Sequence, residues 1–351
     1  MKKKVIAVFL AGVFLAGCMV GCASTSKDEE EKSEMSMFAM DTYMSVTAYG
    51  EGADKATKGA KKEIEKLENL WSVTREDSDI YKVNQNAGNM TAVHEETADI
   101  LSFALDMCEK TGGALDITIY PILSEWGFTT DKQHVPKESR IQELLKNTGY
   151  EKVTLDGTNV MVPQGVQLDL GAVGKGYTAD ILSEQMKKEG IESGLIDLGG
   201  NIKLIGKKPD GSEWNIGIKD PDGEGNIGLL ETEDVSVVTS GGYERYFEEN
   251  GERYWHILDP DTGKPAKSGL SSVTIISPES KVCDALSTAV FVMGLEKAEK
   301  FWREHQNLDF DMLLMTDEKE IYITENLKKD FKLEEKYKDK KLHIIKNTRS
   351  E

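Results

Sequence analysis

A carboxylate, a lysine and three closely spaced glycines stand together at residues 168–180, which read LDLGAVGKGYTAD. Residues 166–170 alternate apolar and polar side chains, a pattern typical of a half-buried strand. From Tyr177 onward apolar residues follow helical spacing, and Gly190 marks a helix stop. Glycines at such a junction let backbone amides approach a ligand, and a helix N-terminus favours phosphate. A phosphate site and a tight packing turn are therefore equally good interpretations of this stretch alone.

A second candidate pair is Asp284 and Thr288, which stand four residues apart in a predicted helix over residues 284–293. They share one helix face, so their oxygens could jointly bind a hard cation. The alternative is the more common fate of such a pair: Asp284 caps the helix and Thr288 packs.

Two further residues are candidates for a functional site, but their sequence surroundings indicate no particular chemistry. Asp116 lies in the run LDIT (115–118) after Gly112 and Gly113, and by itself it is typical of a turn. His256 lies in a predicted strand over residues 254–258, close to an acid and a turn. Taken alone, a core histidine with satisfied hydrogen bonds is the better interpretation.

Other chemical motifs are excluded. Residues 223–228 fit G-x-G-x-x-G, but they follow Asp-Pro-Asp and open no helix, which indicates a loop. The run beginning at His94 has alanine where a zincin needs its second histidine. Cys108 and Cys283 form no C-x-x-C pair; a disulfide between them is possible, but buried helix positions fit them better.

The surrounding pattern mixes helices and strands. Helices are predicted around residues 60–71, 97–110, 137–145 and 295–305, and strands at 38–46, 194–198, 202–205, 214–218, 235–239, 273–276, 312–315 and 321–323. This irregular order favours an α+β fold over a doubly wound sheet. The formal net charge of −19 argues against a nucleic-acid partner, because binding phosphate backbones requires clustered positive charge.

The N-terminus reads as a targeting segment. Three lysines precede a short apolar run, and the box LAGC ends at Cys18, as in a bacterial lipoprotein signal. We therefore expect a signal peptide at residues 1–17, lipidation of Cys18 (with Cys22 a poorer candidate), and a lipid-anchored tether at 18–36. The catalytic domain is expected at 37–345, on the extracytoplasmic face of the cell membrane.

Together the dispersed motifs resemble the family of FAD:protein FMN transferases, the flavin transferases of the ApbE type. They occur in the family's order between residue 40 and about residue 293. The matching runs are MDTY (40–43), TREDSDI (74–80) with Asn84-Gln85, LDIT (115–118), WGF (126–128), residues 168–180, IDLGGN (196–201), TSGGYER (239–245), HILDPDTGKP (256–265) and DALSTA (284–289). Two departures are Asp41, where the family usually has glycine, and Gly242, where many members carry a polar residue.

The resemblance implies a T-fold-like, two-lobed catalytic unit with the active site between the lobes. FAD, the substrate, would contact a set of residues carried over by position: Met40, Thr74, Ala114, Leu115, Asp116, Asp169, Lys175, His256 and Ile257. It also implies Mg²⁺ held by Asp284, the Thr288 hydroxyl and the Ala172 carbonyl. We hypothesise His256 as the general base, with Asp284 as runner-up, because a neutral imidazole titrates near working pH.

The implied reaction moves FMN from FAD to a Ser or Thr hydroxyl of a target protein and releases AMP. The acceptors it suggests are extracytoplasmic membrane redox proteins, such as subunits of Rnf- or Nqr-type complexes. Two alternatives remain: an Mg²⁺-dependent FAD pyrophosphatase that gives FMN and AMP, and a lipid-anchored protein that binds FAD without turnover.

Overall fold

The computed structural model describes residues 31–130 and 132–347. Its largest element is a nine-stranded sheet in which neighbouring strands run antiparallel, except for the parallel last pair. Across the sheet the strands are β1 (Lys32–Ala39), β2 (Thr42–Tyr49), β6 (Ser193–Leu198), β7 (Asn201–Ile205), β10 (Ser236–Gly241), β15 (Leu270–Ser277), β16 (Asp311–Thr316), β17 (Ile321–Thr324) and β19 (Leu342–Ile345).

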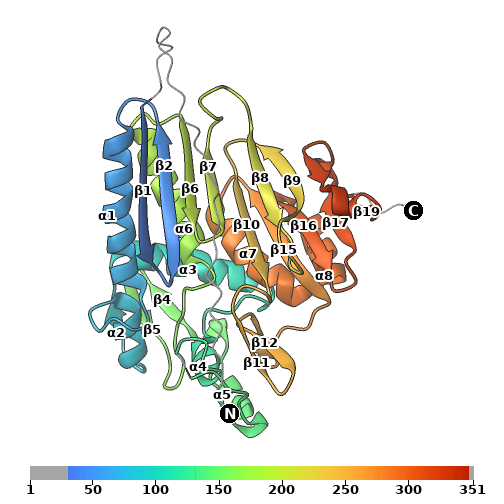
Figure 1. Cartoon of the computed structure of the whole chain (residues 1–351). Coiled ribbons are helices and arrows are strands. Elements are labelled where there is room, and N and C mark those ends of the chain that lie inside the picture. The colour runs from blue at the N-terminus through green and yellow to red at the C-terminus, as the bar shows by residue number, and fades with distance from the viewer. Residues whose placement is uncertain (1–30, 131, 348–351) are drawn as a thin grey trace, which may run out of the picture.

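Helices cover one face of this sheet (Figure 1). Helix α1 (Ala53–Trp71) packs on β1 and β2 because its apolar residues form one stripe, from Ala53 and Ala56 to Ile64 and Leu67. Helices α6 (Gly174–Lys188) and α7 (Ser280–Met293) pack against each other and on the central strands, and α8 (Leu295–Glu304) follows α7. The helices thereby bring residues that are distant in sequence to one side of the sheet.

A second, smaller sheet covers part of the opposite face. It consists of β8 (Trp214–Lys219), β9 (Asn226–Thr232) and β18 (Phe331–Leu333), and β8 and β9 lie in front of the main sheet in Figure 1. Trp214, Ile216 and Leu230 share a buried cluster with residues of β7, β10 and β15–β17. Residues 223–225 of the G-x-G-x-x-G run lie in the β8–β9 connection, as predicted, whereas residues 226–228 begin β9; no helix opens there.

The remaining elements gather mostly at the lower end of the sheet in Figure 1. They include a separate small core built around Ile122, Trp126, Phe128 and Leu258. The elements are α2 (Asp79–Gln85), α3 (Glu95–Lys110), α4 (Tyr120–Glu125), α5 (Glu138–Leu145), β3 (Thr91–Ala92), β4 (Thr154–Asp156), β5 (Asn159–Met161), β11 (Tyr246–Glu249), β12 (Glu252–Trp255), β13 (Leu258–Asp259) and β14 (Lys264–Pro265), with 3-10 turns at Tyr150–Lys152, Gln306–Leu308, Glu325–Lys328 and Glu335–Tyr337.

Most predicted elements are confirmed, and Cys108 and Cys283 are buried free thiols in α3 and α7. Three predicted strands are wrong. Residues 38–46 are two strands joined at a turn, and residues 254–258 are interrupted at His256. Residues 166–170 form no regular strand; only one parallel bridge, between Ile119 and Gln167, ties them to a neighbour.

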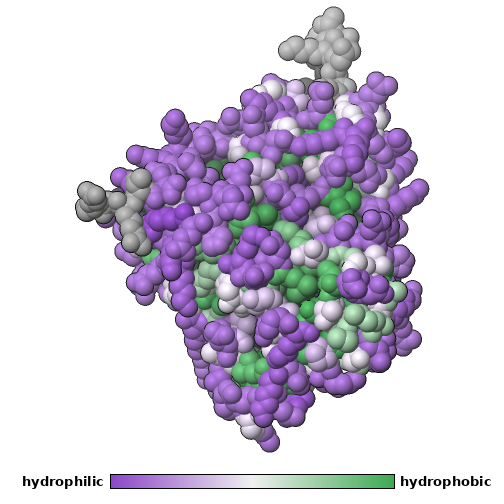
Figure 2. All heavy atoms as spheres, turned by 180° about the vertical axis from the view of Figure 1, so that it is seen from behind, coloured by the Kyte–Doolittle hydropathy of each residue, from purple (hydrophilic) through white to green (hydrophobic). Residues whose placement is uncertain are grey.

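The predicted tether ends earlier than expected. Residues 32–36 belong to β1, where they pair with β2 in register from Lys32 opposite Tyr49. The signal peptide, Cys18 and Cys22 lie outside the described residues. In residues 31–130 and 132–347, no helix has both the length and the apolar character needed to cross a bilayer. The rear face is mostly hydrophilic, with a smaller apolar area near its centre (Figure 2).

The β1–β2 turn has unusual backbone geometry. Met40 and Asp41 both have positive φ, 47° and 59°, as the two central residues of a type I′ hairpin turn do. Glycine is favoured at the second of these positions because it has no Cβ. Asp41 is therefore less favourable at this position than a glycine would be.

Replacing Asp41 with glycine should therefore stabilise the fold. We expect Asp41→Gly to raise the free energy of unfolding by about 0.5 kcal/mol, the relief of left-handed strain less the extra entropy of an unfolded glycine. Urea denaturation measures the change. Asp41→Val is the control and should be less stable than the wild type, because a β-branched side chain is disfavoured at positive φ. A glycine variant less stable than the wild type would contradict this account.

Candidate active site

The glycine-rich stretch before α6 is held in place by side-chain contacts rather than by a strand ladder. The Asn84 amide donates to the Leu168 carbonyl at 2.9 Å and accepts from the Leu168 amide at 2.7 Å. The next amide, of Asp169, donates to the Ile117 carbonyl at 2.8 Å. The chain is thereby fixed on both sides just before the turn that opens α6.

Gly176, in the first turn of α6, permits the closest approach of α6 and α7. A Cβ at this position would lie 2.4 Å from the Ser280 carbonyl oxygen and 2.6 Å from the Asp284 Cβ. With only hydrogen there, the Gly176 amide donates to Asp284 Oδ2 at 2.8 Å. Asp284 is only 5% exposed, so this contact places a buried carboxylate against the start of α6.

The Ala172 carbonyl, in the turn before α6, is also left without a backbone partner. Helix α6 begins at Gly174, so Ala172 lies outside it, and the Gly176 amide is one of the first-turn amides that have no partner within the helix. That amide donates to Asp284, and within the described residues no backbone hydrogen bond reaches the Ala172 oxygen. The Gly176 amide therefore ties the Asp284 carboxylate to the start of α6, next to a turn that carries a carbonyl oxygen with free lone pairs.

This donor set suits magnesium better than a protein-enclosed metal. Asp284 and Thr288 lie one turn apart on α7, and Thr288 is half-buried. Magnesium commonly binds one or two carboxylates and completes its shell with water and substrate phosphate. Across residues 31–130 and 132–347, no three His, Cys, Asp or Glu side chains are grouped so that they could hold a metal ion. The oxygens present therefore fit a cation that is shared with a phosphate ligand.

The simpler interpretation of Asp284, as the cap of its helix, is wrong. Helix α7 begins at Ser280, four residues earlier than the predicted start, so Asp284 lies inside it. The first amides of the helix donate instead to Asp180. The Asp284 carboxylate is therefore available to the region beside α6.

Met40 and Thr74 are connected indirectly. The Met40 amide donates to Glu68 Oε1 at 2.8 Å, and Glu68 Oε2 accepts from Arg75 Nη2 at 3.2 Å, next to Thr74. The Met40 sulfur lies 4.0 Å from the Thr178 hydroxyl of α6. The β1–β2 turn and the exposed α1–α2 loop thus meet at Glu68, near the start of α6.

Asp116 has a structural role in its loop. Its Oδ1 accepts from the Thr118 amide at 2.8 Å and from the Thr118 hydroxyl at 2.6 Å, and its Oδ2 accepts from the Tyr150 amide at 3.1 Å. Burial raises the pKa of Asp116, and these hydrogen bonds oppose the rise. Leu115 is buried and Ala114 is partly exposed, so contact of this loop with flavin stays a prediction.

His256, between β12 and β13, is oriented by the backbone. Its amide and its Nδ1 lie 3.1 and 3.2 Å from the Arg245 carbonyl oxygen, so Nδ1 carries the proton and Nε2 keeps its lone pair. The Phe128 ring packs edge-on to the imidazole, at 6.4 Å between ring centroids. Ile257, the next residue, is buried.

Burial, together with the positive charges of Arg245 and Lys175, lowers the pKa of His256 to about 3. The expectation that this imidazole titrates near working pH is therefore wrong for the ligand-free protein. Burial raises the pKa of Asp169. The hydrogen bond from the Gly171 amide and the positive charges of Arg245 and Lys175 oppose this rise. The structure thus brings Asp169, Lys175 and His256 together within range of one another's charges.

Sequence reasoning assigned no role to two residues of this region. Arg245 donates from Nη2 to the Phe128 carbonyl at 2.8 Å, and its own carbonyl orients His256. Asn84 holds Leu168. Both lie in motif runs noted for the resemblance, and this was the only sequence feature that pointed to them.

Enlarging Gly176 should disrupt the candidate metal site. In Gly176→Ala the added methyl must push α7 away from α6, so we expect a loss of about 2 kcal/mol in the free energy of unfolding from overpacking. Thermal denaturation measures the loss. Gly174→Ala is the matched control, because a Cβ there would meet no atom within 4 Å. Equal effects of the two substitutions would contradict a specific close contact at Gly176.

The lowered pKa of His256 predicts acid sensitivity. The unfolded chain takes up a proton at this residue near pH 6.5 and the folded protein only near pH 3, so the free energy of unfolding should fall between these values as pH drops. His256→Gln should lose less stability than the wild type over that interval. The exposed His134→Gln serves as control. Denaturant titrations at several pH values test this, and parallel curves for wild type and His256→Gln would contradict it.

Comparison with known proteins agrees with this geometry. The ApbE family profile matches residues 40–312. A FAD:protein FMN transferase of Treponema pallidum (strain Nichols) is 38% identical over 265 residues, which cover 70% of this chain and 73% of that protein. A second, of Escherichia coli (strain K12), is 30% identical over 313 residues, covering 85% of this chain and 89% of that protein.

Solved structures resemble this fold over most of its length. The ApbE protein of Thermotoga maritima superimposes with a TM-score of 0.80 at 34% identity, covering 86% of this chain and 99% of that one. The flavin transferase ApbE of Vibrio cholerae gives a TM-score of 0.78 at 26% identity, with the same coverage. The predicted α+β flavin transferase fold is confirmed, and this chain belongs to the ApbE family.

Proposed function

We propose that this protein transfers FMN from FAD to a Ser or Thr hydroxyl of a second protein and releases AMP. The observation that carries the proposal is the Gly176–Asp284 contact, which ties a buried carboxylate to the start of α6, next to Lys175 and to the turn that carries the Ala172 carbonyl with its free lone pairs. Relatives named FAD:protein FMN transferase, at 30–38% identity over most of the chain, support it.

The reaction is an in-line displacement at phosphorus. The acceptor oxygen forms a bond to the FMN-side phosphorus while the bond from that phosphorus to the bridging oxygen breaks. AMP leaves with the bridging oxygen, and the hydroxyl proton passes to a base. Such displacements depend more on positioning and charge neutralisation than on covalent participation by the enzyme.

Asp284, the Thr288 hydroxyl and the Ala172 carbonyl would hold Mg²⁺. When bound, the ion supplies charge neutralisation at the diphosphate. The chain adds its own cations, because Lys175 and Arg245 both lie within electrostatic range of Asp169 and His256. These cations favour the FAD diphosphate over a neutral ligand.

His256 would act as the base only once substrate is present. In the ligand-free protein two cations and burial keep its pKa at about 3, where it is a weak base. A bound diphosphate compensates these cations and favours the charged imidazolium, which raises the pKa toward neutrality. The free Nε2 lone pair is then suited to take the acceptor proton. Without bound FAD, His256 is too weak a base to take a proton efficiently from a water molecule.

The proposed location is the extracytoplasmic face of the membrane, through a lipid on Cys18. It is supported by the LAGC box and by the charged segment that precedes β1. The proposed acceptors are membrane redox proteins such as Rnf- or Nqr-type subunits, for which an anchored enzyme is well placed.

A pair of isosteric variants tests the metal ligands. With purified protein, FAD, Mg²⁺ and an acceptor, Thr288→Val should reduce transfer by more than about 100-fold because it removes one ligand oxygen, whereas Thr288→Ser keeps the hydroxyl and most activity. Asp284→Asn should behave like Thr288→Val. The acceptor is weighed by mass spectrometry, and AMP and free FMN are measured in parallel.

The products also decide the reaction class. An acceptor heavier by one FMN, with AMP released, supports the transferase. An unchanged acceptor with rising free FMN indicates a pyrophosphatase, and FAD binding without AMP indicates a binding protein; either result contradicts the proposal. Full activity of Thr288→Val or Asp284→Asn would exclude those residues as metal ligands.

A further inference from the structure

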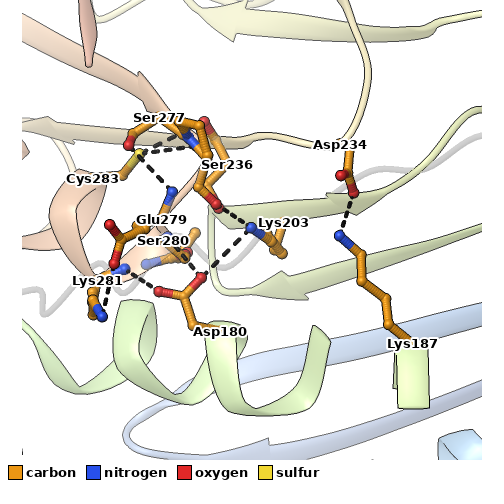
Figure 3. Close-up of polar contacts among 12 residues, drawn as sticks. Asp180, Lys187, Lys203, Asp234, Ser236, Ser277, Glu279, Ser280, Lys281 and Cys283 are labelled. Atoms are coloured by element: carbon orange, nitrogen blue, oxygen red, sulfur yellow. Dashed lines mark hydrogen bonds and ion pairs between the residues drawn. The ribbon is translucent and has the colours of Figure 1, made fainter. Parts of the chain in front are cut away.

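Helix α7 is attached to α6 at a second point, one turn from the Gly176–Asp284 contact. The carboxylate of Asp180, on α6, accepts from the Ser280 amide at 2.8 Å and from the Lys281 amide at 2.9 Å (Figure 3). These two amides begin α7 and have no partner within the helix itself. The α7 N-terminus is therefore capped by a neighbouring helix instead of by its own preceding residue.

A buried lysine pairs with the Asp180 carboxylate that forms this cap. The Lys203 side chain, on β7, is 6% exposed, and its Nζ lies 3.6 Å from Asp180 Oδ1 and donates to the Pro278 carbonyl (Figure 3). Lysine is almost never so buried without a paired charge. Burial raises the pKa of Asp180, while the two amides and Lys203 oppose the rise. Lys203 thus helps to keep the Asp180 carboxylate in its charged, doubly accepting form.

The same strand supplies a third contact. Asn201, 1% exposed, accepts from the Ser280 hydroxyl through Oδ1 at 2.8 Å. Asn201 ends the run IDLGGN, one of the motif runs to which sequence reasoning gave no role. This run and Lys203 together link the sheet to the first residue of α7.

The spacing of these contacts shows that they act together on the position of α7 relative to α6. Gly176 and Asp180 lie one turn apart on α6, and Ser280 and Asp284 lie one turn apart on α7. Asp180 holds Ser280 while Gly176 holds Asp284, so the two helices are joined at two points in antiparallel register. Two contacts along α7 restrain its rotation relative to α6 more than one would, and with it the direction of the Asp284 carboxylate.

We propose that Lys203, through Asp180 and the start of α7, is a positioning residue for the Asp284–Ala172 cation site. This inference rests on the proposed function, since it concerns the metal that the transfer would use. Lys203 touches neither substrate nor metal. It acts by holding Asp180 charged and in place, which sets the rotation and height of α7 relative to the Ala172 carbonyl. Outer partners of this kind commonly change metal affinity by 10–100-fold.

The test compares two ion pairs of the same region, Lys203–Asp180 and Lys187–Asp234. In Lys203→Met the buried charge is lost, and we expect Mn²⁺ affinity in the presence of FAD, measured by electron paramagnetic resonance, to fall about tenfold. The Mg²⁺ concentration for half-maximal transfer should rise in proportion, with FAD affinity in the absence of metal unchanged. Hydrogen exchange at residues 280–283 of the metal-free protein should become faster.

Lys187→Met is the matched control. Lys187 Nζ pairs with Asp234 Oδ1 at 2.6 Å near the other end of α6, and both side chains are about half exposed (Figure 3). Its Mn²⁺ affinity should equal that of the wild type. Asp180→Asn, which keeps the shape of the side chain but removes the charge that pairs with Lys203, is a second variant and should lower Mn²⁺ affinity severalfold; it decides the matter if Lys203→Met fails to fold.

The outcomes separate the two proposals. A wild type that binds Mn²⁺ with FAD and transfers FMN, together with a folded Lys203→Met of wild-type Mn²⁺ affinity, would overturn this inference and leave the proposed function intact. Unchanged Mn²⁺ affinity in Asp180→Asn, where only that variant folds, overturns it equally. A wild type that binds no Mn²⁺ with FAD contradicts the metal-dependent function and the inference with it.

Discussion

The close approach of α6 to α7 at Gly176 is the constraint on which the candidate site depends. One absent side chain lets a first-turn amide of α6 reach the Asp284 carboxylate at 2.8 Å, and in the turn just before α6 the Ala172 carbonyl accepts no backbone hydrogen bond from the described residues. The packing of α6 on α7 therefore also determines the position of the Asp284 carboxylate. The interhelical approach that excludes a Cβ also brings the Asp284 carboxylate of α7 to the start of α6, next to the turn that carries the Ala172 carbonyl.

Electrostatics at the candidate site follow from the same compactness. Burial alone would disfavour every charged group, and opposite charges and backbone amides compensate this cost. Asp169 is stabilised by the Gly171 amide and by Arg245 and Lys175, whereas His256 is kept neutral by those same cations. The ligand-free site is thus biased toward accepting negative charge, which suits a diphosphate that arrives with two or more charges.

The elements were largely predictable from sequence, because helix stripes such as that of α1 and strand alternation such as that of β8 are strong local patterns. Turn chemistry was harder: nothing in FAMDTY distinguishes one long strand from a hairpin unless positive φ is assumed at Asp41. The irregular segment at residues 166–170 alternates like a strand, yet it is fixed by the Asn84 side chain, a contact across 84 residues that local patterns do not encode. The start of α7 was misplaced for a related reason, since its cap, Asp180, comes from another helix.

Site residues were identified from motif resemblance, and the structure adds the physical relations between them. Asp284 and Asp169 owe their positions to backbone amides of glycines, and the distant pair of Lys203 and Asp180 could not be recognised by spacing because the two belong to different elements. A residue type in a motif therefore indicates that a position matters, but the direction in which its atoms point is decided by tertiary contacts.

Much of the site's polar chemistry resides in the main chain. The carbonyl that orients His256 belongs to Arg245, the amide that holds Asp284 belongs to Gly176, and the proposed metal-binding carbonyl belongs to Ala172. Side-chain substitution leaves these main-chain atoms in place, so an alanine scan reports on the side chains at these positions and not on the atoms that make the contacts. Replacing individual peptide bonds with esters would reveal the contribution of the main chain.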